Sequence, residues 1–153
     1  MRDRRLSLDT NILVYAMDRD AGERHDLAME IVDRAVDADC ILTLQSLCEF
    51  YAAVTGKGKI PRKEAESQII DWMELFPLAS ATPKSLLRAL KGVKEHGLSF
   101  WDALLWAVVA EAGVAILLSE DFQHTRVVEG VQFCNPFAMD DPLAQVFKNL
   151  TEN

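Results

Sequence analysis

The chain has 153 residues, of which 50% are hydrophobic and 26% charged, as expected for one globular domain with one hydrophobic core. Its formal net charge of −8 argues against a protein that holds nucleic acid through a broad basic surface. The N-terminus lacks the apolar stretch of a signal peptide, and the longest apolar run, at 103–110, is too short to cross a bilayer. We therefore expect a soluble cytoplasmic protein with no membrane contact.

Short apolar runs alternate with helical patterns along the chain. Strands are predicted at 5–8, 40–44, 114–118 and 131–134, with a weaker candidate near 77–80, and helices at 11–17, 22–37, 46–55, 62–76, 83–95 and 99–112. This alternation is typical of βαβ units. It predicts an α/β fold, a three-layer α/β/α sandwich with a central, mainly parallel sheet of four or five strands. We assign residues 1–137 to one domain and 138–153 to a tail that packs on it as a short helix, through Leu143, Val146, Phe147 and Leu150.

Carboxylates follow two of the predicted strands. Asp9 ends the first strand, and Asp121 comes shortly after the strand at 114–118, in the sequence "ILLSEDF". Ligands of open parallel sheets bind outside the carboxyl ends of the strands, so acids in these places are candidates for a site. The simpler alternative is that Asp9 or Thr10, and likewise Asp121, only cap the helical turns that follow.

Two further acids lie on predicted helices. Glu49 falls on the side of its helix opposite the apolar stripe, and alone it would be an ordinary exposed glutamate. Asp102 lies in "SFWDALLWAVVAEAG", a pattern apolar nearly all round and therefore predicted to be buried. Asp102 could form a capping box with Ser99, but a cap does not explain the apolar surface around it. Because an unpaired buried charge costs several kcal/mol, we expect a cation nearby.

Several carboxylates at the mouth of a parallel sheet suit Mg²⁺ or Mn²⁺, which prefer oxygen ligands and leave positions open for substrate phosphate oxygens. Such a site can hydrolyse a phosphodiester without a covalent nucleophile. The chain contains no G-x-S-x-G motif and no paired Cys and His that would supply one. Cys40, Cys48 and Cys134 lie among apolar neighbours and are expected to be reduced core thiols, not zinc ligands.

Five motifs in order resemble the PIN-domain family and, within it, the VapC-type toxins of bacterial toxin–antitoxin pairs. They are "LDTNILVYAMD", "LQSLCEFYAAV", "SFWDALLWAVVAEAG", "LLSEDF" and "VVEGVQFCNPF", which together span roughly residues 5–137. The resemblance implies a metal-dependent endoribonuclease whose acidic cluster is Asp9, Glu49, Asp102 and Asp121, with Asn11 and Ser119 as supporting polar residues. The family also includes non-toxin nucleases that act on other RNA or on DNA. Glu120 is an additional acid, and the tail after Phe137 is longer than expected.

The resemblance also implies two protein partners. One is a second copy of the chain in a homodimer, for which the tail and the apolar stripe at 69–76 could supply surface, although the stripe could equally cover the chain's own core. The other is an antitoxin that silences the enzyme by placing an Arg among the carboxylates, where bidentate pairing would compete with the metal. An RNA substrate needs local positive charge in so acidic a chain. The candidates lie in "GKGKIPRK": Lys57, Lys59, Arg62 and Lys63, which could instead be solvated loop charges.

Rival functions lack the residues they require. A phosphatase of the haloacid dehalogenase type needs D-x-D after its first strand, and position 11 is Asn. A response-regulator receiver needs a Lys after a late strand, and "LLSEDF" has none. A catalytically silent binding module would be favoured by the loss of one of the acids, and the sequence retains Asp9, Glu49, Asp102 and Asp121.

Overall fold

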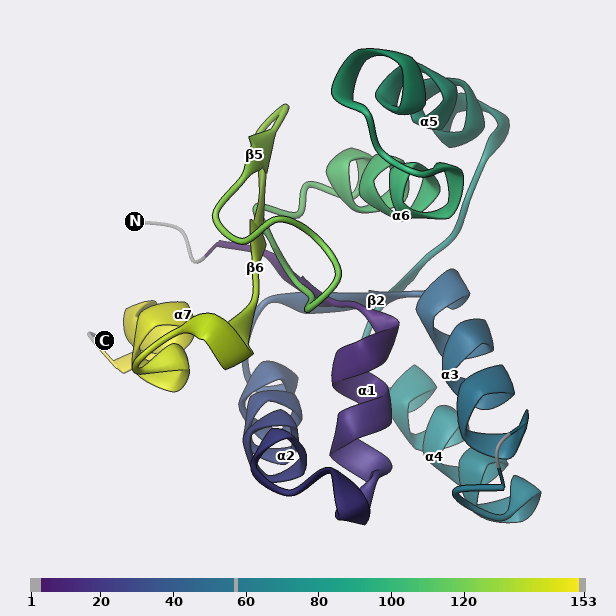
Figure 1. Cartoon of the computed structure of the whole chain (residues 1–153), viewed down its shortest axis with the longest axis vertical. Coiled ribbons are helices and arrows are strands. Elements are labelled where there is room, and N and C mark those ends of the chain that lie inside the picture. The colour runs from purple at the N-terminus through teal and green to yellow at the C-terminus, as the bar shows by residue number, and fades with distance from the viewer. Residues whose placement is uncertain (1–3, 57, 152–153) are drawn as a thin grey trace.

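A six-stranded sheet forms the centre of the protein (Figure 1). The computed structural model describes residues 4–56 and 58–151. The strands are β1 (Leu6–Leu8), β2 (Cys40–Thr43), β3 (Leu78–Ala79), β4 (Ile116–Leu118), β5 (Val127–Val128) and β6 (Val131–Cys134). Their order is β3-β2-β1-β4-β6-β5, and only β5 pairs antiparallel with its neighbour. β1 therefore lies inside the sheet, between β2 and β4.

Helices cover both faces of the sheet, which confirms the predicted three-layer α/β fold, with six strands in place of four or five. The helices are α1 (Thr10–Met17), α2 (Glu23–Val36), α3 (Leu44–Gly56), α4 (Arg62–Leu75), α5 (Pro83–His96), α6 (Phe100–Glu111) and α7 (Pro142–Thr151). Figure 1 shows α5 and α6 on one side of the sheet and the other five on the opposite side. None of the helices within the described residues is long and apolar enough to cross a membrane.

The alternation of side chains along the strands divides the interior into two cores. Leu6 and Leu8 of β1 pack with α1, α2, α3 and α4 in the larger core. Leu117 of β4 faces the other way and packs with α6, β5 and β6 in the smaller core. The buried Ser7 lies between these leucines and donates a hydrogen bond of 2.8 Å to the carbonyl oxygen of Ile41. Both faces of the central strands are thus buried, as expected for a parallel sheet.

The β5–β6 hairpin was not predicted from the sequence. Glu129 and Gly130 join the two strands with φ values of 48° and 87°, so both turn residues adopt the left-handed region that a two-residue hairpin turn requires. The buried indole of Trp106 donates a hydrogen bond of 3.1 Å to the carbonyl oxygen of Val128 and fixes the hairpin to α6. A strand of two residues is too short to leave a periodic pattern in the sequence.

The tail packs on the larger core. Val146 and Phe147 of α7 are buried, and the partly buried Leu143 packs beside them. The predicted contact of Leu150 lies outside the side chains that the structure describes. These contacts come from the same helix face, at the spacing that the sequence predicted.

The cysteines are free thiols in two environments. Cys40 and Cys134 are buried as predicted, and burial raises the pKa of the Cys40 thiol to about 12. The prediction of a core position was wrong for Cys48, which is exposed on α3. Cys48 neighbours the apolar stripe in sequence but lies on the outward side of the helix.

Helix α5 packs on α6 through small residues and turns its larger ones outward. Ser85, Ala89 and Gly92 are its buried positions. A Cβ at Gly92 would lie 2.8 Å from Cζ3 of Trp106, a fully buried ring. The exposed side of α5 carries Leu86, Leu87, Leu90 and Val93.

Replacing Gly92 with Ala should therefore destabilise the protein, although this substitution usually stabilises a helix. Overpacking against Trp106 is expected to lower the free energy of unfolding by about 1–3 kcal/mol. Gly56 is the matched control, because it also lies in a helix and a Cβ there would meet nothing within 4 Å. Gly56→Ala should either leave the free energy of unfolding unchanged or raise it by at most about 1 kcal/mol. Urea denaturation measures both, and an equal effect of the two variants would contradict close α5–α6 packing.

Candidate active site

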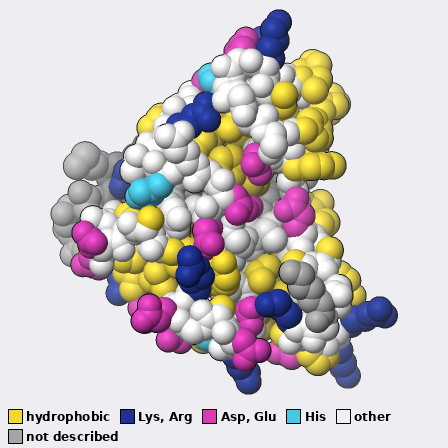
Figure 2. Space-filling view, viewed as in Figure 1, with side chains coloured by type: hydrophobic (Ala, Val, Ile, Leu, Met, Phe, Trp, Pro, Cys, Tyr) yellow, Lys and Arg dark blue, Asp and Glu magenta, His cyan; other side chains and the backbone are white. Residues whose placement is uncertain are grey.

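The carboxyl edge of the sheet opens into a cavity of about 310 Å³, here called the acidic cavity. Asp9, Glu49, Asp102 and Asp121 all line it, together with Thr10, Asn11, Val14, Tyr15, Gln45, Trp101 and Leu105. Figure 2 shows acidic side chains gathered in the middle of this face. The structure therefore places in one cavity the four acids that the sequence singled out, from the end of β1, from α3, from α6 and from the segment after β4.

Asp9 is held from both strand ends. Its backbone N–H donates to the carbonyl oxygen of Leu118 at 2.9 Å, which continues the β1–β4 pairing past the end of β1. Its carboxylate accepts hydrogen bonds of 2.7 Å from the Thr10 N–H and 2.7 Å from Ser119 Oγ. Asp9 is thus the N-cap residue of α1, as the capping alternative predicted, and it also lines the acidic cavity.

Burial makes the ionised form of Asp9 costly. Only 5% of the residue is exposed, and this burial is the main cause that raises its pKa to about 6. The hydrogen bonds from Ser119 and Thr10 lower the pKa, and the charges of Asp121 and Glu49 raise it further. Ionised Asp9 at neutral pH is therefore disfavoured by its burial and by the neighbouring carboxylates.

Asn11 and Ser119 connect the first strand end to the second. The amide nitrogen of Asn11 donates to Asp121 Oδ2 and to Ser119 Oγ, each at 3.2 Å. Its amide oxygen accepts the backbone N–H of Glu120 at 3.2 Å, and the N–H of Asp121 donates to Ser119 Oγ at 3.0 Å. These bonds fix the segment after β4 against the start of α1. Both residues contact acids of the cavity, where the sequence resemblance had assigned them a supporting role.

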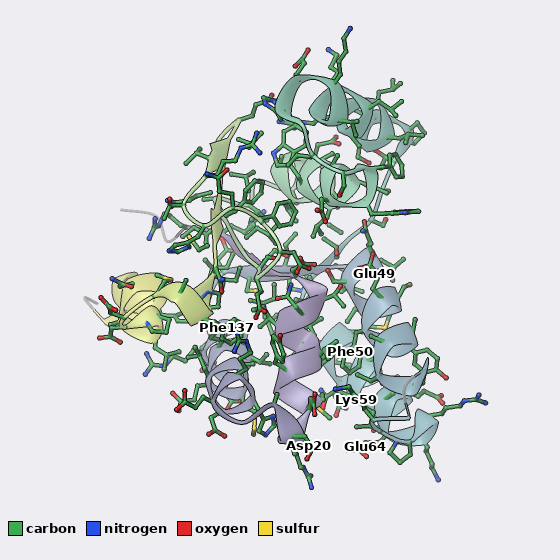
Figure 3. The ribbon with its side chains drawn as sticks, in the orientation of Figure 1. Asp20, Glu49, Phe50, Lys59, Glu64 and Phe137 are labelled. Atoms are coloured by element: carbon green, nitrogen blue, oxygen red, sulfur yellow. The ribbon has the colours of Figure 1, made fainter. Side chains whose placement is uncertain are left out.

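Both carboxylate oxygens of Glu49 have donors. Thr10 Oγ1 donates to Oε2 and Gln45 Nε2 to Oε1, each at 3.0 Å, and the same Gln45 nitrogen lies 3.3 Å from the carbonyl oxygen of Trp101. Figure 3 shows Glu49 toward the end of α3 that meets the sheet. Thr10, Gln45 and Trp101 were not predicted as site residues. Gln45 carried a usable signal, since residues four apart on a helix are neighbours.

Asp102 lies in the first turn of α6, whose residues Ala103 and Leu105–Val109 are buried as predicted. Phe100 and Trp101, which precede Asp102, are exposed, so the predicted burial was wrong for the start of this helix. Ser99 is the N-cap residue of α6 but forms no side-chain capping bond, so the capping-box alternative is wrong. Asp102 itself is half-buried and faces the acidic cavity. No Lys, Arg or His of the described residues forms an ion pair with it, so the cation expected beside it is not one of these side chains.

Glu120 does not line the acidic cavity. It accepts hydrogen bonds of 3.0 Å from Arg24 and 3.2 Å from the Tyr15 hydroxyl. The Arg24 guanidinium lies 5.8 Å from the centre of the Tyr15 ring and 5.2 Å from that of Phe137, which Figure 3 labels. The extra acid in the "LLSEDF" motif is therefore neutralised by a cation of α2.

The basic loop lies away from the acidic cavity. Figure 3 places Lys59 at the end of α3 opposite Glu49, near Asp20. Lys59 pairs with Asp18 at 2.5 Å, and this hydrogen bond raises the pKa of Lys59 and lowers that of Asp18. Arg62 and Lys63 begin α4, and Lys57 lies outside the described residues. Contact of these four residues with RNA stays a prediction.

The donor chemistry of the acidic cavity fits a hard divalent cation. No described Lys, Arg or His nitrogen lies within 4.0 Å of a carboxylate oxygen of its four acids. Oxygen donors without a cationic partner are the ligands that Mg²⁺ and Mn²⁺ prefer. Among the described residues, however, no three His, Cys, Asp or Glu side chains stand close enough to hold one ion together. The cavity therefore has the right donors in a more open arrangement than a formed metal centre.

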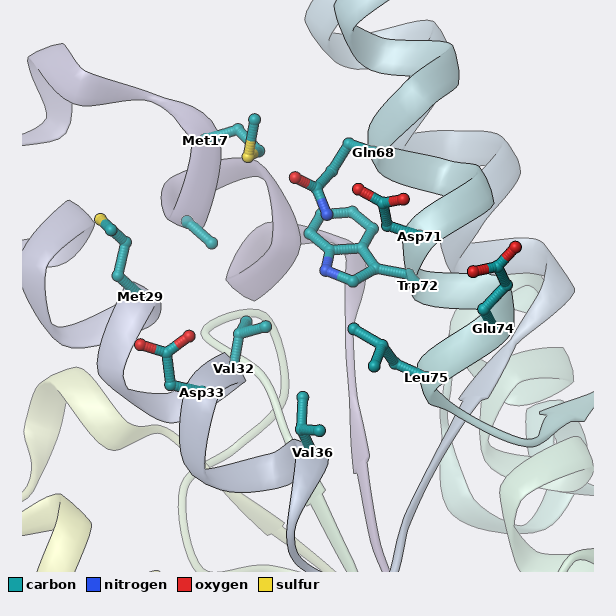
Figure 4. Close-up of a pocket in the computed structure, with 11 residues that line it drawn as sticks. Met17, Met29, Val32, Asp33, Val36, Gln68, Asp71, Trp72, Glu74 and Leu75 are labelled. Carbon is teal, nitrogen blue, oxygen red and sulfur yellow. The ribbon is translucent and has the colours of Figure 1, made fainter.

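A second cavity, of about 400 Å³, lies between α1, α2 and α4 (Figure 4). We call it the α2–α4 groove. Its apolar surface comes mainly from Met17, Met29, Val32, Val36, Trp72 and Leu75. Asp33, Asp71 and Glu74 supply negative charge at its sides. The α2–α4 groove therefore combines an apolar floor with acidic borders.

The fold and the acidic cavity define an α/β protein that gathers carboxylates at the mouth of a parallel sheet. Residues 6–130 match the PIN domain, and the chain belongs to that family. This confirms the resemblance found in the sequence motifs. No curated protein sequence matched the chain.

Solved structures with the same fold include toxin–antitoxin proteins. A toxin–antitoxin complex from Klebsiella pneumoniae has a TM-score of 0.60 and 16% identity, over 82% of this chain and 94% of that one. Mycobacterium tuberculosis VapC20, a sarcin–ricin loop cleaving toxin, has a TM-score of 0.58 and 16% identity, over 73% and 86%. VapBC2 from Rickettsia felis, bound to a DNA fragment from its promoter, has a TM-score of 0.60 and 13% identity, over 84% and 96%. At these identities the likeness shows a shared fold.

The raised pKa of Asp9 predicts that Asp9→Asn stabilises the metal-free protein at pH 7. The folded state keeps the Asp9 proton up to a pKa of about 6, against a usual value of 3.8, so ionisation above that pH opposes folding. Removing the charge should raise the free energy of unfolding by up to about 3 kcal/mol at pH 7. The gain should shrink as the pH falls through 6 and vanish near 4.

Urea denaturation in EDTA at pH 7 and pH 4.5 measures this difference. Asp71→Asn is the matched control, since Asp71 is exposed and should give no comparable gain. If Asp9→Asn lowered stability equally at both pH values, the loss of its hydrogen bonds would outweigh the relief of its burial.

Proposed function

We propose that the chain is a metal-dependent endoribonuclease, the toxin of a toxin–antitoxin pair, which hydrolyses RNA phosphodiester bonds at the acidic cavity. The observation that carries this proposal is the meeting of Asp9, Glu49, Asp102 and Asp121 in one cavity of a PIN domain. The similar fold of VapC20, a toxin that cleaves the sarcin–ricin loop, supports RNA as the substrate. An acidic nuclease of this kind would act in the cytoplasm, where its RNA substrates are.

The four acids would hold Mg²⁺ or Mn²⁺ through their carboxylate oxygens. When bound, such an ion polarises a phosphate and activates a water molecule for hydrolysis. The chain's own residues keep the carboxylates in place: Ser119 and Thr10 hold Asp9, Asn11 holds Asp121, and Gln45 with Thr10 holds Glu49. Because no three of these side chains stand close enough to share one ion, ion binding would draw the carboxylates together. The hydrogen bonds restrict their side-chain rotamers beforehand, which lowers the conformational entropy lost in that step.

Asp102→Asn tests the proposal most directly. The substitution keeps the size of the side chain and removes one of the proposed ligands, so Mg²⁺-dependent cleavage of single-stranded RNA should fall by about 100-fold or more. EDTA should abolish cleavage by the wild type, and added Mg²⁺ should restore it. Circular dichroism should show an unchanged fold, because Asp102 is half-buried and does not cap α6.

Glu120→Gln is the matched control for this experiment. Glu120 precedes Asp121 in sequence but pairs with Arg24 outside the acidic cavity, so its cleavage rate should stay within about threefold of wild type. Equal activity of the Asp102 variant and the wild type would exclude the acidic cavity as the active site. Cleavage of DNA but not RNA by the wild type would assign the same site to another nuclease function.

We also propose an antitoxin partner that docks in the α2–α4 groove. Apolar side chains of the partner would contact Met29, Val32 and Trp72, and basic ones would face Asp33, Asp71 and Glu74. An Arg that continued into the acidic cavity would pair with its carboxylates and compete with the metal. The toxin–antitoxin complexes among the structures of similar fold support such a partner.

Coexpression with the product of the neighbouring reading frame tests this partner. A basic neighbour should copurify with the chain and suppress RNA cleavage. The double variant Asp71→Lys and Glu74→Lys should weaken its retention by about tenfold or more, because like charges would face each other across the groove. Glu66→Lys with Glu111→Lys changes the net charge equally at exposed positions outside the groove and should retain the partner. Equal retention of both variants would place the partner elsewhere.

A homodimer belongs to the same proposal. Trp72 and Phe76 of the 69–76 stripe are buried in the chain's own core, while Ile70 and Met73 are exposed. The outer face of α5, with Leu86, Leu87, Leu90 and Val93, offers a more continuous apolar surface than the stripe. We therefore favour α5 over the tail and the 69–76 stripe as the surface between two copies.

A further inference from the structure

A neutral cavity of about 340 Å³ adjoins the acidic cavity. Its walls include Leu44, Cys48, Ser80 and Leu104, and no charged residue is among those that line it. Gln45 and Trp101 line both cavities and so form the boundary between them. One side of this boundary is strongly acidic and the other is apolar and uncharged.

Trp101 is the most exposed tryptophan of the chain. Its exposed fraction is 63%, whereas Trp72 and Trp106 are buried in the two cores. The backbone of Trp101 is tied to α3, since Gln45 Nε2 donates to its carbonyl oxygen at 3.3 Å. The Phe100 ring packs edge-on against the indole, with 5.0 Å between ring centres. A large apolar ring is thus held at the mouth of the proposed active site without being needed for the core.

A nucleotide has the chemistry that matches these two cavities. Its phosphate is charged and suits an ion held at the acidic side, while its base is flat, aromatic and uncharged. Every base has a π-face that stacks on an indole, so such a contact tolerates any sequence. A polypeptide that covered Trp101 would bury the exposed indole, but its chemistry would not match a neutral cavity on one side of the ring and an acidic cavity on the other.

We propose that Trp101 and the neutral cavity bind one unstacked nucleobase of the substrate, next to the phosphate at the acidic cavity. This inference rests on the proposed function and adds a base-binding site to it. A base inside a duplex is stacked on both faces and paired at its edge, so it does not reach a pocket at the side of the strand. The substrate is therefore single-stranded or looped at the cleaved position, and Trp101 is a positioning residue for it.

Three variants test the role of the ring, with cleavage of a short single-stranded RNA as the assay. Trp101→Leu should raise KM by about tenfold and change kcat little, because the stacking platform is lost while the acids remain. Trp101→Phe retains an aromatic face and should stay within about threefold of wild type. Val127→Ala is the control for loss of exposed apolar surface, since Val127 lies on β5 outside both cavities, and it should leave KM unchanged.

An abasic substrate separates stacking from a structural effect. Removing the base on one side of the cleaved phosphate should raise KM for the wild type by about the same tenfold factor and should cause no further rise in Trp101→Leu. A merely structural role of Trp101 predicts that the two losses add. Equal KM values for Trp101→Leu and Trp101→Phe, or additive losses at every abasic position, would overturn the inference.

Cys48 provides a readout that needs no cleavage. It is the exposed thiol of the chain and lines the neutral cavity, whereas Cys40 and Cys134 are buried. Single-stranded RNA should slow the reaction of Cys48 with a thiol reagent, and the abasic RNA should not. Protection without any cleavage would refute the nuclease proposal and support the base-binding site. Cleavage without protection would support the nuclease proposal and overturn the base-binding site. Protection that grows with protein concentration in the absence of RNA would assign the cavity to a second copy and overturn the inference.

Discussion

The gathering of carboxylates in a partly buried cavity is the constraint on which the rest of the site depends. Burial is the main cause of the raised pKa of Asp9, and the charges of Asp121 and Glu49 raise it further, because like charges disfavour one another's ionisation. The chain opposes the repulsion with neutral donors: hydroxyls of Thr10 and Ser119, and side-chain amides of Asn11 and Gln45. Neutral donors orient carboxylates without cancelling their charge, so the attraction for an external cation is preserved.

The Lys and Arg residues that form ion pairs in the described part of the chain lie outside the acidic cavity, where they leave this attraction intact. Arg24 neutralises Glu120, the acid nearest in sequence to Asp121, and Lys59 neutralises Asp18 at the far end of α1. Arg88 pairs with Glu129 at the β5–β6 turn, where His96 Nε2 also lies 2.9 Å from the Glu129 carboxylate. An Arg or Lys inside the acidic cavity would take the place of the proposed metal ion, as the Arg of the proposed antitoxin would from outside. The distribution of ion pairs therefore leaves the carboxylates of the acidic cavity without a cationic side-chain partner among the described residues.

The sequence predicted the elements whose patterns are long and the acids whose places are set by strand ends. Asp9 follows β1 directly and Asp121 follows β4 after Ser119 and Glu120, and parallel pairing of β1 with β4 brings both acids to one edge. Asp102 was indicated by its place in an apolar helix pattern, whereas Glu49 needed the family resemblance, because a helix pattern shows which face is polar but not what that face meets. Gln45 and Trp101 escaped prediction for the same reason, since their roles depend on contacts between α3 and α6. Strand β5 was missed because two residues are too few to show an alternation of apolar and polar side chains.

The central place of β1 in the sheet has a consequence for how the protein is made. Leu6, the first residue of the sheet to be synthesised, pairs with Ile116, and the backbone of Asp9 bonds to Leu118. Contacts between residues so far apart in sequence slow folding, because a long loop must close before they form. A nascent chain would have to emerge past β4 before the acidic cavity exists. Synthesis of most of the domain therefore precedes any assembled site, and a chain cut short before β4 would lack the acidic cavity.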